Sequence, residues 1–476
     1  MPIVVTNTLT GARETFEPMR PGEVSMYVCG LTVYDEAHIG HARTIAAYDF
    51  IRRHLEYRGY RVRHVMNVTD VDDKIIHRAR ETGEEPLALA RRIEKLVDAS
   101  LDELGILRPH ASPRVSEHID GIVRMAQTLI DRGHAYVGED EHGRSVYFDV
   151  RADPDYGKLS HLDLDQMLEG VRKDVAEGKR HPADFALWKA AKPGEVAWDS
   201  PWGKGRPGWH IECSVMSTEA FGPAFDIHGG GWDLIFPHHE NELAQTESAT
   251  GVDPAVKYWI HAGFLTVNGE KMSKSLGNFT TLRAALAKWP ARVLRLWLAG
   301  THYRSPIDMS EAGLAQAAKN VERLDTMLAN VEHALAKPPA RAMDDRDRAL
   351  VALARERREA FDAAMDNDFN TPVALATLLE LVGDVNRALA ANVHPEALAK
   401  ARDVVLSFTD RLGLAPAKTA ARGGEGEGAL LELLVELREA ARKRRDFATS
   451  DRIRDRLGEL GFVVEDTAGG PRARRK

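Results

Sequence analysis

Near residue 30 the pattern of hydrophobic residues changes from a period of two to the period of a helix. Residues 24–28 alternate apolar side chains with Ser25 and Tyr27, which predicts a β-strand, and Gly30 then permits a turn. Apolar residues at 45–55 recur at helical spacing, and Gly59 follows where the predicted helix ends. A strand that leads into a helix through a short loop is typical of the first unit of a nucleotide-binding α/β fold.

The pattern continues with a second strand and a second helix before it becomes irregular. Residues 63–68 predict a strand, and residues 86–106 predict an amphipathic helix that packs on the sheet. A helix at 116–132 then leads to a β-hairpin with strands at 135–137 and 145–148. Polar segments with many Pro and Gly residues follow, and they indicate an insertion between the two halves of the nucleotide-binding fold.

Strands and helices return in the second half of the chain. Residues 225–228 and 257–264 predict strands, and the glycines at 229–231 predict a loop of close approach after the first of them. From 291 to 412 the pattern is almost entirely helical, which predicts a bundle. A flexible linker rich in Ala, Gly and Glu then precedes a final basic segment, for which we predict helix, helix and strand.

The composition is that of an ordinary globular protein. The 476 residues are 43% hydrophobic and 29% charged, which allows about two to four domains with a substantial core. No stretch approaches the roughly 18 apolar residues that a membrane span needs, and the N-terminus lacks the features of a signal peptide. We therefore expect a cytoplasmic protein without a membrane partner.

The net charge of −8 does not exclude a nucleic-acid partner, because phosphate contacts need only a local basic surface. Such a surface is predicted in the last segment, around Arg442, Lys443, Arg444 and Arg445. A run of basic residues is by default a solvated face. Its position after a linker favours contact with RNA phosphates.

The chain has two cysteines, Cys29 and Cys213, so it cannot form a disulfide framework. Two buried apolar thiols are one interpretation. Both cysteines lie in stretches rich in glycine and histidine, which favours metal ligation.

Two short motifs carry candidate chemistry. The sequence HIGH contains His38, Gly40 and His41: the glycine lets a flat base approach the backbone, and imidazoles beside a helix N-terminus can donate hydrogen bonds to phosphate oxygens. On its own the motif is weak evidence, because most such histidines cap a helix or lie on the surface. The sequence KMSKS contains Lys271 and Lys274 in a glycine- and serine-rich loop, and these cations can close over a leaving pyrophosphate.

A third group of candidates follows the strand at 225–228. Gly229 and Gly230 permit close approach, and Asp233 is placed to accept hydrogen bonds from ribose hydroxyls. If the next segment is helical, His238 and Glu242 stand at positions i and i+4 on one face. This spacing allows both side chains to bind the same metal ion.

HIGH and KMSKS, in this order, resemble the motif pair of class I aminoacyl-tRNA synthetases. The stretches YVCGLTVYDEAHIGHAR, GRPGWHIECS and FDIHGGGWDLIFPHHENE resemble the cysteinyl-tRNA synthetase family, and the resemblance runs nearly the whole chain. One departure is Leu31, where that family usually has proline. It affects loop stiffness and touches no obvious chemical role.

The resemblance implies an ATP-dependent ligase that joins L-cysteine to tRNA(Cys). ATP, as its Mg²⁺ complex, would react with the carboxylate of cysteine and release pyrophosphate, and the aminoacyl group would pass first to the 2′-hydroxyl of the terminal adenosine. The implied catalytic residues, which position the triphosphate and neutralise its charge, are His38, His41, Lys271 and Lys274. The implied ATP-binding residues are His38, Gly40, His41, Gly229, Gly230, Asp233 and Lys274.

The resemblance also implies one zinc ion per chain, and its ligands would be Cys29, Cys213, His238 and Glu242. His239 is the rival imidazole in the same motif. Zinc binds thiolate far better than hydroxyl, which would distinguish cysteine from its near-isostere serine. The implied cysteine-binding residues are Cys29, Thr69, Trp209 and His238.

Two alternative functions remain open at this point. One is the related ligase that joins cysteine to glucosaminyl-inositol in mycothiol biosynthesis, which resembles the same catalytic core but lacks the long region after residue 306. The other is a non-catalytic RNA- or metal-binding paralogue, which the intact motifs and the four candidate ligands disfavour.

The predicted fold class is α/β: a Rossmann-type parallel-sheet catalytic domain with an inserted connective domain, followed by an α-helical bundle that binds tRNA and a small C-terminal module. We expect a monomer. The predicted domains are the first Rossmann half at 1–113, the connective insertion at 114–208, the second Rossmann half at 209–250, the KMSKS-loop and stem-contact region at 251–305, the helical anticodon-binding bundle at 306–414, the linker at 415–428 and the basic module at 429–476.

Overall fold

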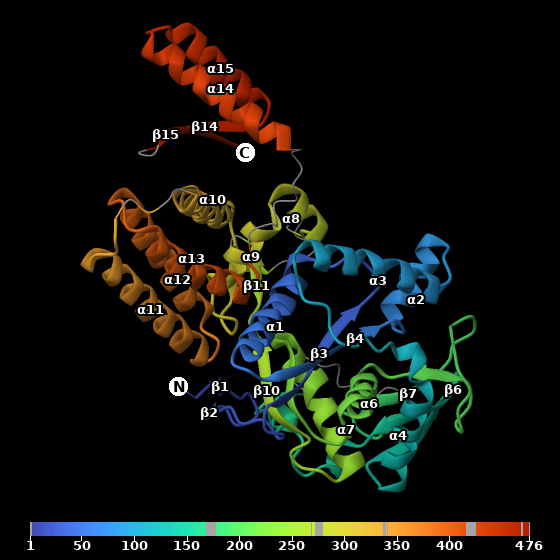
Figure 1. Cartoon of the computed structure of the whole chain (residues 1–476). Helices are drawn as coiled ribbons and strands as arrows, with labels where there is room; N and C mark the ends of the chain where they lie inside the picture. Colours follow the sequence, from blue (N-terminus) through green and yellow to red (C-terminus); the bar gives the residue numbers. More distant parts are fainter. Residues whose placement is uncertain are drawn as a thin grey trace.

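The computed structural model describes residues 2–167, 178–267, 269–271, 279–336, 339, 341–415, 425–467 and 470–475 (Figure 1). None of the helices in this part of the chain has the length and hydropathy that crossing a membrane requires.

A four-stranded parallel sheet forms the centre of the N-terminal half. Its strands, in spatial order, are β10 (Val256–Ala262), β9 (Phe225–Gly231), β3 (Glu23–Thr32) and β4 (Arg61–Thr69). Helix α1 (Ile39–Tyr57) connects β3 to β4, and Gly59 follows its C-terminus with a φ of +90°. The predicted strand–helix–strand unit and its Rossmann-type sheet are therefore confirmed.

The insertion after β4 folds around a second sheet. Helix α4 (Ile119–Asp131) precedes the predicted hairpin of β5 (Ala135–Asp140) and β6 (Gly143–Phe148). The sheet is completed by β7 (Phe185–Ala190) and β8 (Gly205–Pro207), and all its pairs are antiparallel. The remaining helices of this half are α2 (Asp73–Thr82), α3 (Pro86–Glu103), α5 (Leu164–Met167), α6 (Trp209–Phe221) and α7 (Glu240–Thr250), and a hairpin of β1 (Val4–Thr6) and β2 (Arg13–Thr15) begins the chain.

Alternation along β3 separates two hydrophobic cores. Met26 and Val28 belong to the core that includes α1. Tyr27 and Cys29 belong to the other core, which includes residues of α4, α6 and α7. Because successive side chains of a strand point to opposite faces, the strand places Cys29 on the face away from α1.

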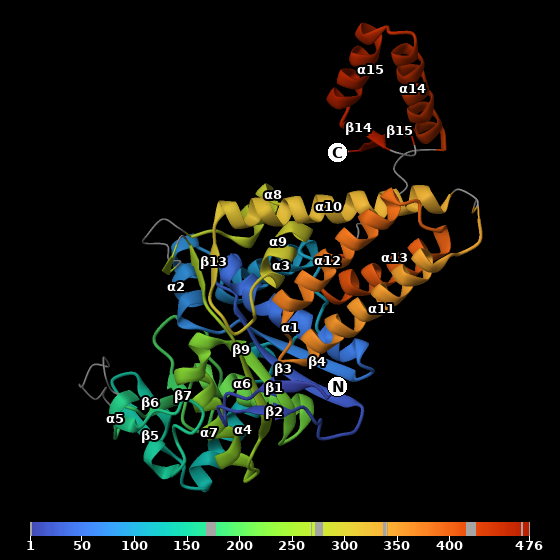
Figure 2. The ribbon, with the colours of Figure 1, turned by 90° about the vertical axis from the view of Figure 1, so that its left-hand side faces the viewer.

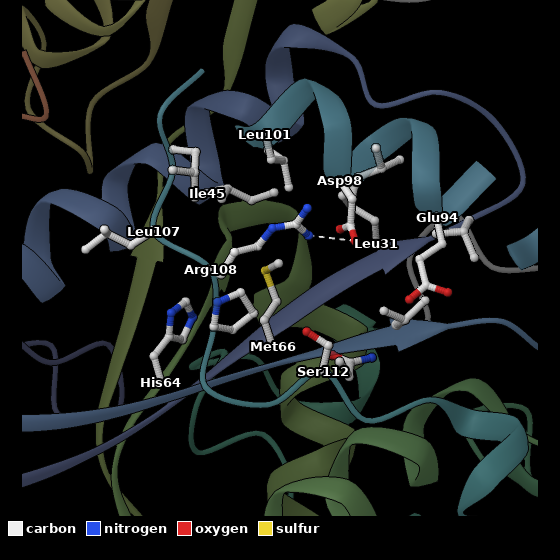
Figure 3. A pocket seen from close by; sticks show the side chains of 16 residues that line it. Leu31, Ile45, His64, Met66, Glu94, Asp98, Leu101, Leu107, Arg108 and Ser112 are labelled. Carbon is white, nitrogen blue, oxygen red and sulfur yellow. Dashed lines mark ion pairs between the residues drawn. The ribbon is translucent and has the colours of Figure 1, made fainter. Parts of the chain in front are cut away.

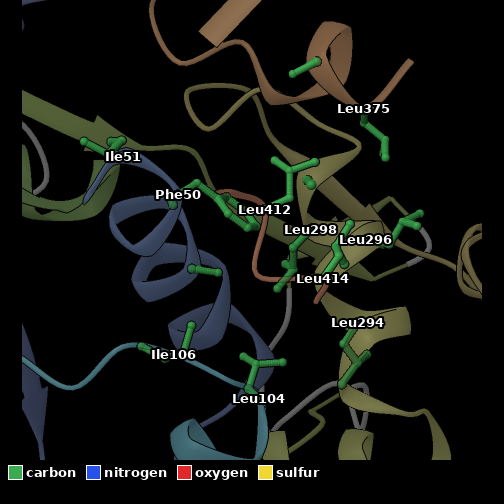
Figure 4. Packing of buried hydrophobic residues seen from close by; sticks show 14 of the residues in the cluster. Phe50, Ile51, Leu104, Ile106, Leu294, Leu296, Leu298, Leu375, Leu412 and Leu414 are labelled. Atoms are coloured by element: carbon green, nitrogen blue, oxygen red, sulfur yellow. The ribbon is translucent and has the colours of Figure 1, made fainter. Parts of the chain in front are cut away.

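The C-terminal half is a helical bundle that shares its core with the sheet domain. Its long helices are α10 (Glu311–Leu335), α11 (Asp345–Asp366), α12 (Thr371–Ala390) and α13 (Pro395–Arg411), and α8 (Leu282–Lys288) and α9 (Ala291–Ala299) precede them (Figure 2). Figure 4 shows Phe50 of α1, Leu298 of α9 and Leu412 in one packed cluster. A buried ion pair between Asp49 and Arg295 lies within the same contact. The bundle is therefore packed directly on the first helix of the nucleotide-binding fold.

Four local predictions need correction. The glycines at 229–231 lie inside β9, not in a loop after it. Residues 307–309 form a strand, β13 (Ile307–Met309), which pairs with β11 (Leu265–Val267); its pairing partner is distant in sequence, so local periodicity does not reveal it.

The other two corrections concern the C-terminal module. Helix α14 (Glu425–Lys443) begins within the predicted linker, because the leucine spacing further along propagates a helix back over its glycines. After α15 (Phe447–Glu459) and β14 (Phe462–Thr467) comes a second strand, β15 (Gly470–Arg475), where we predicted only one strand.

Candidate active site and metal centre

His38 and His41 begin helix α1 as a reciprocal cap. The Nδ1 of His38 accepts from the backbone N–H of His41 at 3.2 Å, and the Nδ1 of His41 accepts from the N–H of His38 at 3.3 Å. The two rings stack with centroids 3.5 Å apart. Since both Nδ1 atoms accept, the neutral rings carry their protons on Nε2 and remain donors there.

Electrostatics keep His41 neutral. Burial, followed by the neighbouring His38, lowers the pKa of His41 well below its usual value of 6.5. The capping interpretation and the phosphate interpretation of HIGH are therefore compatible, because capping uses Nδ1 and a phosphate would use Nε2. Gly40 lies in the first turn of the same helix.

The KMSKS segment lies mostly outside the described residues. Lys274 falls there, as does the side chain of Lys271, whose backbone ends β12 (Glu270–Lys271) and pairs with β11. The chain is described again from Phe279, and here it joins the start of α1: the N–H of Ile39 donates to the carbonyl of Thr280 at 3.1 Å. Thr281 in turn forms a β-bridge with His38.

The glycines of β9 are required by packing. A Cβ on Gly229 would lie 2.3 Å from the ring of Tyr48, and a Cβ on Gly230 would lie 2.6 Å from the ring of His239. Tyr48 holds this position because its hydroxyl accepts from the N–H of Gly230 at 2.6 Å. Asp233 follows in an exposed 3₁₀ turn, Trp232–Leu234.

Four side chains from four elements converge in the second core. Cys29 lies on β3, Cys213 on α6, and His238 and Glu242 lie in the turn and helix that follow β9. The Sγ atoms of the two cysteines are 3.7 Å apart, and the Sγ of Cys29 is 3.3 Å from Oε1 of Glu242. The Nε2 of His238 is 2.8 Å from the same oxygen. All four ligand atoms lie within 4.8 Å of one another.

The charges of this cluster favour a bound cation. Burial raises the pKa of Cys29 and of Glu242 well above their usual values, whereas the hydrogen bond from Cys29 lowers the pKa of Cys213. Among the described residues, the ion pairs of Glu242 are all with histidines, and its Oε2 has no hydrogen-bond partner. Two thiols, an imidazole and a carboxylate at this spacing form a donor set that fits zinc. A zinc ion would supply the positive charge that balances the buried carboxylate and thiolates.

Two further imidazoles lie beside the cluster: that of His239, the rival already named from the motif, and that of His228, which was not predicted. The Nε2 of His228, on β9, is 3.5 Å from the Sγ of Cys29, and the Nε2 of His239 is 3.3 Å from it. With Cys29 and Glu242 these two histidines make a second possible ligand set. The sequence feature that could have indicated His228 is its position directly before the glycines of β9. Glycines allow other side chains to pack close to the strand, so a histidine beside them can contact a neighbouring site.

The predicted cysteine-binding residues border the same cluster. The ring of Trp209, at the start of α6, stacks on the ring of His238 with centroids 4.2 Å apart. The hydroxyl of Thr69, at the end of β4, donates to Oε2 of Glu212 at 3.5 Å, and Glu212 directly precedes Cys213. The structure therefore brings these residues together at the carboxyl ends of β3 and β4.

A cavity on the other side of β3 is a less suitable site. Its volume is about 30 Å³, and it lies between the sheet edge and α3 (Figure 3). Leu31, the departure from the family pattern, lines it beside Met66, and an ion pair joins Asp98 to Arg108 at 2.6 Å. A space of this size holds about one water molecule, not a nucleotide or an amino acid.

The predicted RNA-contact residues are exposed but not all helical. Arg442 and Lys443 end α14, whereas Arg444 and Arg445 lie in the turn after it, where Arg445 has a φ of +62°. The four cations therefore lie along a helix end and its turn instead of along a single helix.

Comparison with known proteins gives matches along most of the chain. Residues 15–319 match a family model described as the class I (C) catalytic domain of tRNA synthetases. Residues 360–416 match a DALR domain, and residues 429–474 match a cysteinyl-tRNA ligase anticodon binding domain.

Curated proteins and solved structures give consistent results. The chain is 50% identical over 473 residues to a cysteine–tRNA ligase of Thermococcus onnurineus, covering 99% of this chain and 98% of that protein. It is 48% identical over 486 residues to a cysteine–tRNA ligase of Heliobacterium modesticaldum, covering 99% of both. Its fold is similar to that of a Mycobacterium tuberculosis methionyl-tRNA synthetase in complex with methionyl-adenylate, with a TM-score of 0.61 and 18% identity over 82% of this chain and 90% of that one.

Proposed function

Because this chain belongs to the family of cysteine–tRNA ligases, which are class I aminoacyl-tRNA synthetases, we propose that the site assembled at the ends of β3 and β4 activates L-cysteine with ATP and transfers it to tRNA(Cys). The observation that carries this proposal is the position of one strand. Near its carboxyl end β3 contributes Cys29 to the buried ligand cluster, and the loop after β3 leads to His38, the N-cap of α1. The candidate ligand cluster and the start of α1 are thus connected by residues 29–38 of one strand–helix unit.

The activation step needs positioning and charge neutralisation more than a side-chain nucleophile. A carboxylate oxygen of cysteine forms a bond to the α-phosphorus of ATP, the bond from that phosphorus to the pyrophosphate oxygen breaks, and pyrophosphate leaves. His38 and His41 donate from Nε2 toward the phosphate oxygens, Gly40 leaves room for the base, and Lys271 and Lys274 neutralise the leaving group together with Mg²⁺. Asp233, on its exposed turn, accepts from the ribose hydroxyls.

The metal ligands of this proposal are Cys29, Cys213, His238 and Glu242, holding one zinc ion per chain. Zinc bound there supplies selection of a soft thiolate over a hydroxyl. The protein's own residues orient the substrate: Trp209 stacks on His238, and Thr69 lies beside the cluster through its hydrogen bond to Glu212.

Transfer consumes the adenylate. The 2′-hydroxyl of the terminal adenosine attacks the carbonyl carbon of the aminoacyl group, AMP leaves, and the hydroxyl proton is released. The anticodon-binding match at 429–474 supports tRNA as the acceptor, and it disfavours the glucosaminyl-inositol ligase, which lacks such a region. We further propose that the protein works as a monomer, for which sedimentation should give the chain mass of 52.7 kDa.

Pyrophosphate exchange into ATP, measured separately with each of the twenty amino acids, tests this function. We expect exchange with cysteine and only background with serine, because the ligand set prefers sulfur to oxygen. Exchange driven by serine, or by no amino acid, would contradict the proposal.

Removal of the chain after Ala415 is expected to separate the two halves of the reaction. All residues proposed for activation lie before this point, and the most extensive contacts of α14, α15, β14 and β15 are with one another. Cysteine-dependent exchange should therefore stay near normal. The KM for tRNA should rise and its dependence on salt should flatten, because fewer phosphate contacts release fewer counterions.

The matched control for the truncation is the full chain with Arg442, Lys443, Arg444 and Arg445 replaced by glutamine. If these side chains make the phosphate contacts, this variant should reproduce most of the change in salt slope with the module still present. Aminoacylation by the truncated protein at the full-length rate across a salt series would show that the module has another role.

A further inference from the structure

Three hydrogen bonds in series connect the N-terminal segment to the sulfur of Cys29. The Oγ1 of Thr8 is 2.8 Å from Nδ1 of His261. The Nε2 of His261 is 2.7 Å from Nδ1 of His239. The Nε2 of His239 is 3.3 Å from the Sγ of Cys29. Both nitrogens of both rings are used, so the series has no interruption.

The first member is held in place by its backbone. The N–H of Thr8 donates to the carbonyl of Trp259 on β10 at 2.8 Å, and the carbonyl of Thr8 accepts from Nε2 of His161 at 3.0 Å. The two histidines of the series, His239 and His261, are almost fully buried. Burial lowers the pKa of His261 to about 3, so this ring carries a single N–H at neutral pH.

A neutral imidazole has one donor and one acceptor nitrogen, so the series can run in two directions. If the Thr8 hydroxyl donates, His261 donates from Nε2 to His239, and His239 then carries its proton on Nε2, facing Cys29. In the reverse direction His239 carries its proton on Nδ1 and presents the lone pair of Nε2 to the sulfur.

The two directions have opposite consequences for the metal centre. With a lone pair on Nε2, His239 can bind the metal, and with Cys29, His228 and Glu242 it completes the set that omits Cys213. With a proton on Nε2 it cannot be a ligand, and it becomes a hydrogen-bond donor to the sulfur. A metal-bound cysteine is a thiolate, which attracts an N–H and repels a lone pair. The donating direction is therefore the one that agrees with a thiolate at Cys29.

We propose that Thr8 is a positioning residue of the metal centre: its hydroxyl donates to His261 and thereby directs His239 to donate to Cys29 instead of binding the metal. This inference rests on the proposed zinc site and deepens it. It explains why the set with two sulfurs, which includes Cys213 and His238, holds the metal although a second set of four groups lies within reach.

The direct test is the tautomer of His239 in the zinc-loaded, full-length protein. Histidine labelled with ¹⁵N distinguishes a proton on Nε2 from one on Nδ1, and the His239→Gln variant identifies the signal. We expect the Nε2–H tautomer. An Nδ1–H tautomer, or a His239 that is itself coordinated to zinc, would overturn the inference, and neither result requires a variant of Thr8 to fold.

The second test compares three variants of the N-terminal segment by competition with a zinc chelator. Thr8→Val keeps the shape of the side chain and removes the hydroxyl, so we expect the zinc affinity to fall roughly 10–100-fold, as for other groups that orient a metal site. Thr8→Ser keeps the hydroxyl and should restore most of the affinity. Thr10→Val is the matched control, because the Thr10 hydroxyl donates to Glu14 outside the series.

The outcomes separate this inference from the proposed function. In cobalt(II)-substituted protein, the sulfur-to-metal absorption reports how many thiolates are bound, and we expect Thr8→Val to weaken it while Thr10→Val leaves it unchanged. Equal affinity and equal spectra for Thr8→Val and Thr10→Val would refute a role for Thr8 even if the enzyme binds zinc and activates cysteine. Failure of the unmodified protein to bind zinc would instead refute the proposed metal centre.

Discussion

Replacement of Cys213 by alanine is expected to remove zinc from the protein and with it the activation of cysteine. Cys213 supplies one of the two sulfurs of the proposed set, 3.7 Å from the other, and both are buried. Of the proposed set, its loss leaves one thiol, one imidazole and one carboxylate, whereas structural zinc sites have four ligands. Zinc measured by elemental analysis should fall from one ion per chain to a small fraction.

The same substitution should reduce cysteine-dependent pyrophosphate exchange by more than the roughly 10–100-fold that losing a group outside the ligand set costs. Ser217→Ala is the matched control: it lies one turn further along α6, is also buried, and its hydroxyl donates to the carbonyl of Ser214 at 3.2 Å. The control should keep both its zinc and its exchange activity. Unchanged zinc content in Cys213→Ala would exclude Cys213 as a ligand.

The order of strands and helices in the sheet domain was predictable because each transition has a local cause. Gly30 ends the alternating part of β3 at a point where a Cβ would lie 1.7 Å from the carbonyl oxygen of Asn67. Gly59, with a φ of +90°, ends α1. The i, i+4 spacing of His238 and Glu242 likewise gave the correct juxtaposition, with 2.8 Å between their nearest atoms.

Groups that meet only through tertiary structure were not predictable. His228, His261 and Thr8 approach the cluster from β9, β10 and the segment after β1, and no spacing in the sequence relates them. Strand β13 was missed for a similar reason, since it is short and pairs with β11 across intervening helices. Local periodicity reports a residue's own element and face, whereas partners distant in sequence depend on how the elements pack.

Alanine substitution of Lys271 or Lys274 is expected to slow the activation step roughly 10²–10³-fold, which is the usual cost of removing one preorganised group that stabilises charge in the transition state. Negative charge on the departing pyrophosphate grows during the reaction, so each lysine should interact more strongly with the transition state than with bound ATP. The kcat for exchange should therefore fall, with a smaller change in the KM for cysteine.

Contacts just downstream of the KMSKS segment support an effect of its two lysines on the activation step. Two residues downstream of the segment contact the start of α1: the carbonyl of Thr280 accepts from the N–H of Ile39, and Thr281 forms a β-bridge with His38. Lys288 offers the matched control, because it lies on α8, is exposed and pairs with Glu311 at 2.6 Å. Lys288→Ala should leave both kinetic constants unchanged. If Lys271→Ala and Lys274→Ala raised only KM, the two lysines would bind the ground state and the transition state equally, and the role proposed for them in catalysis would be wrong.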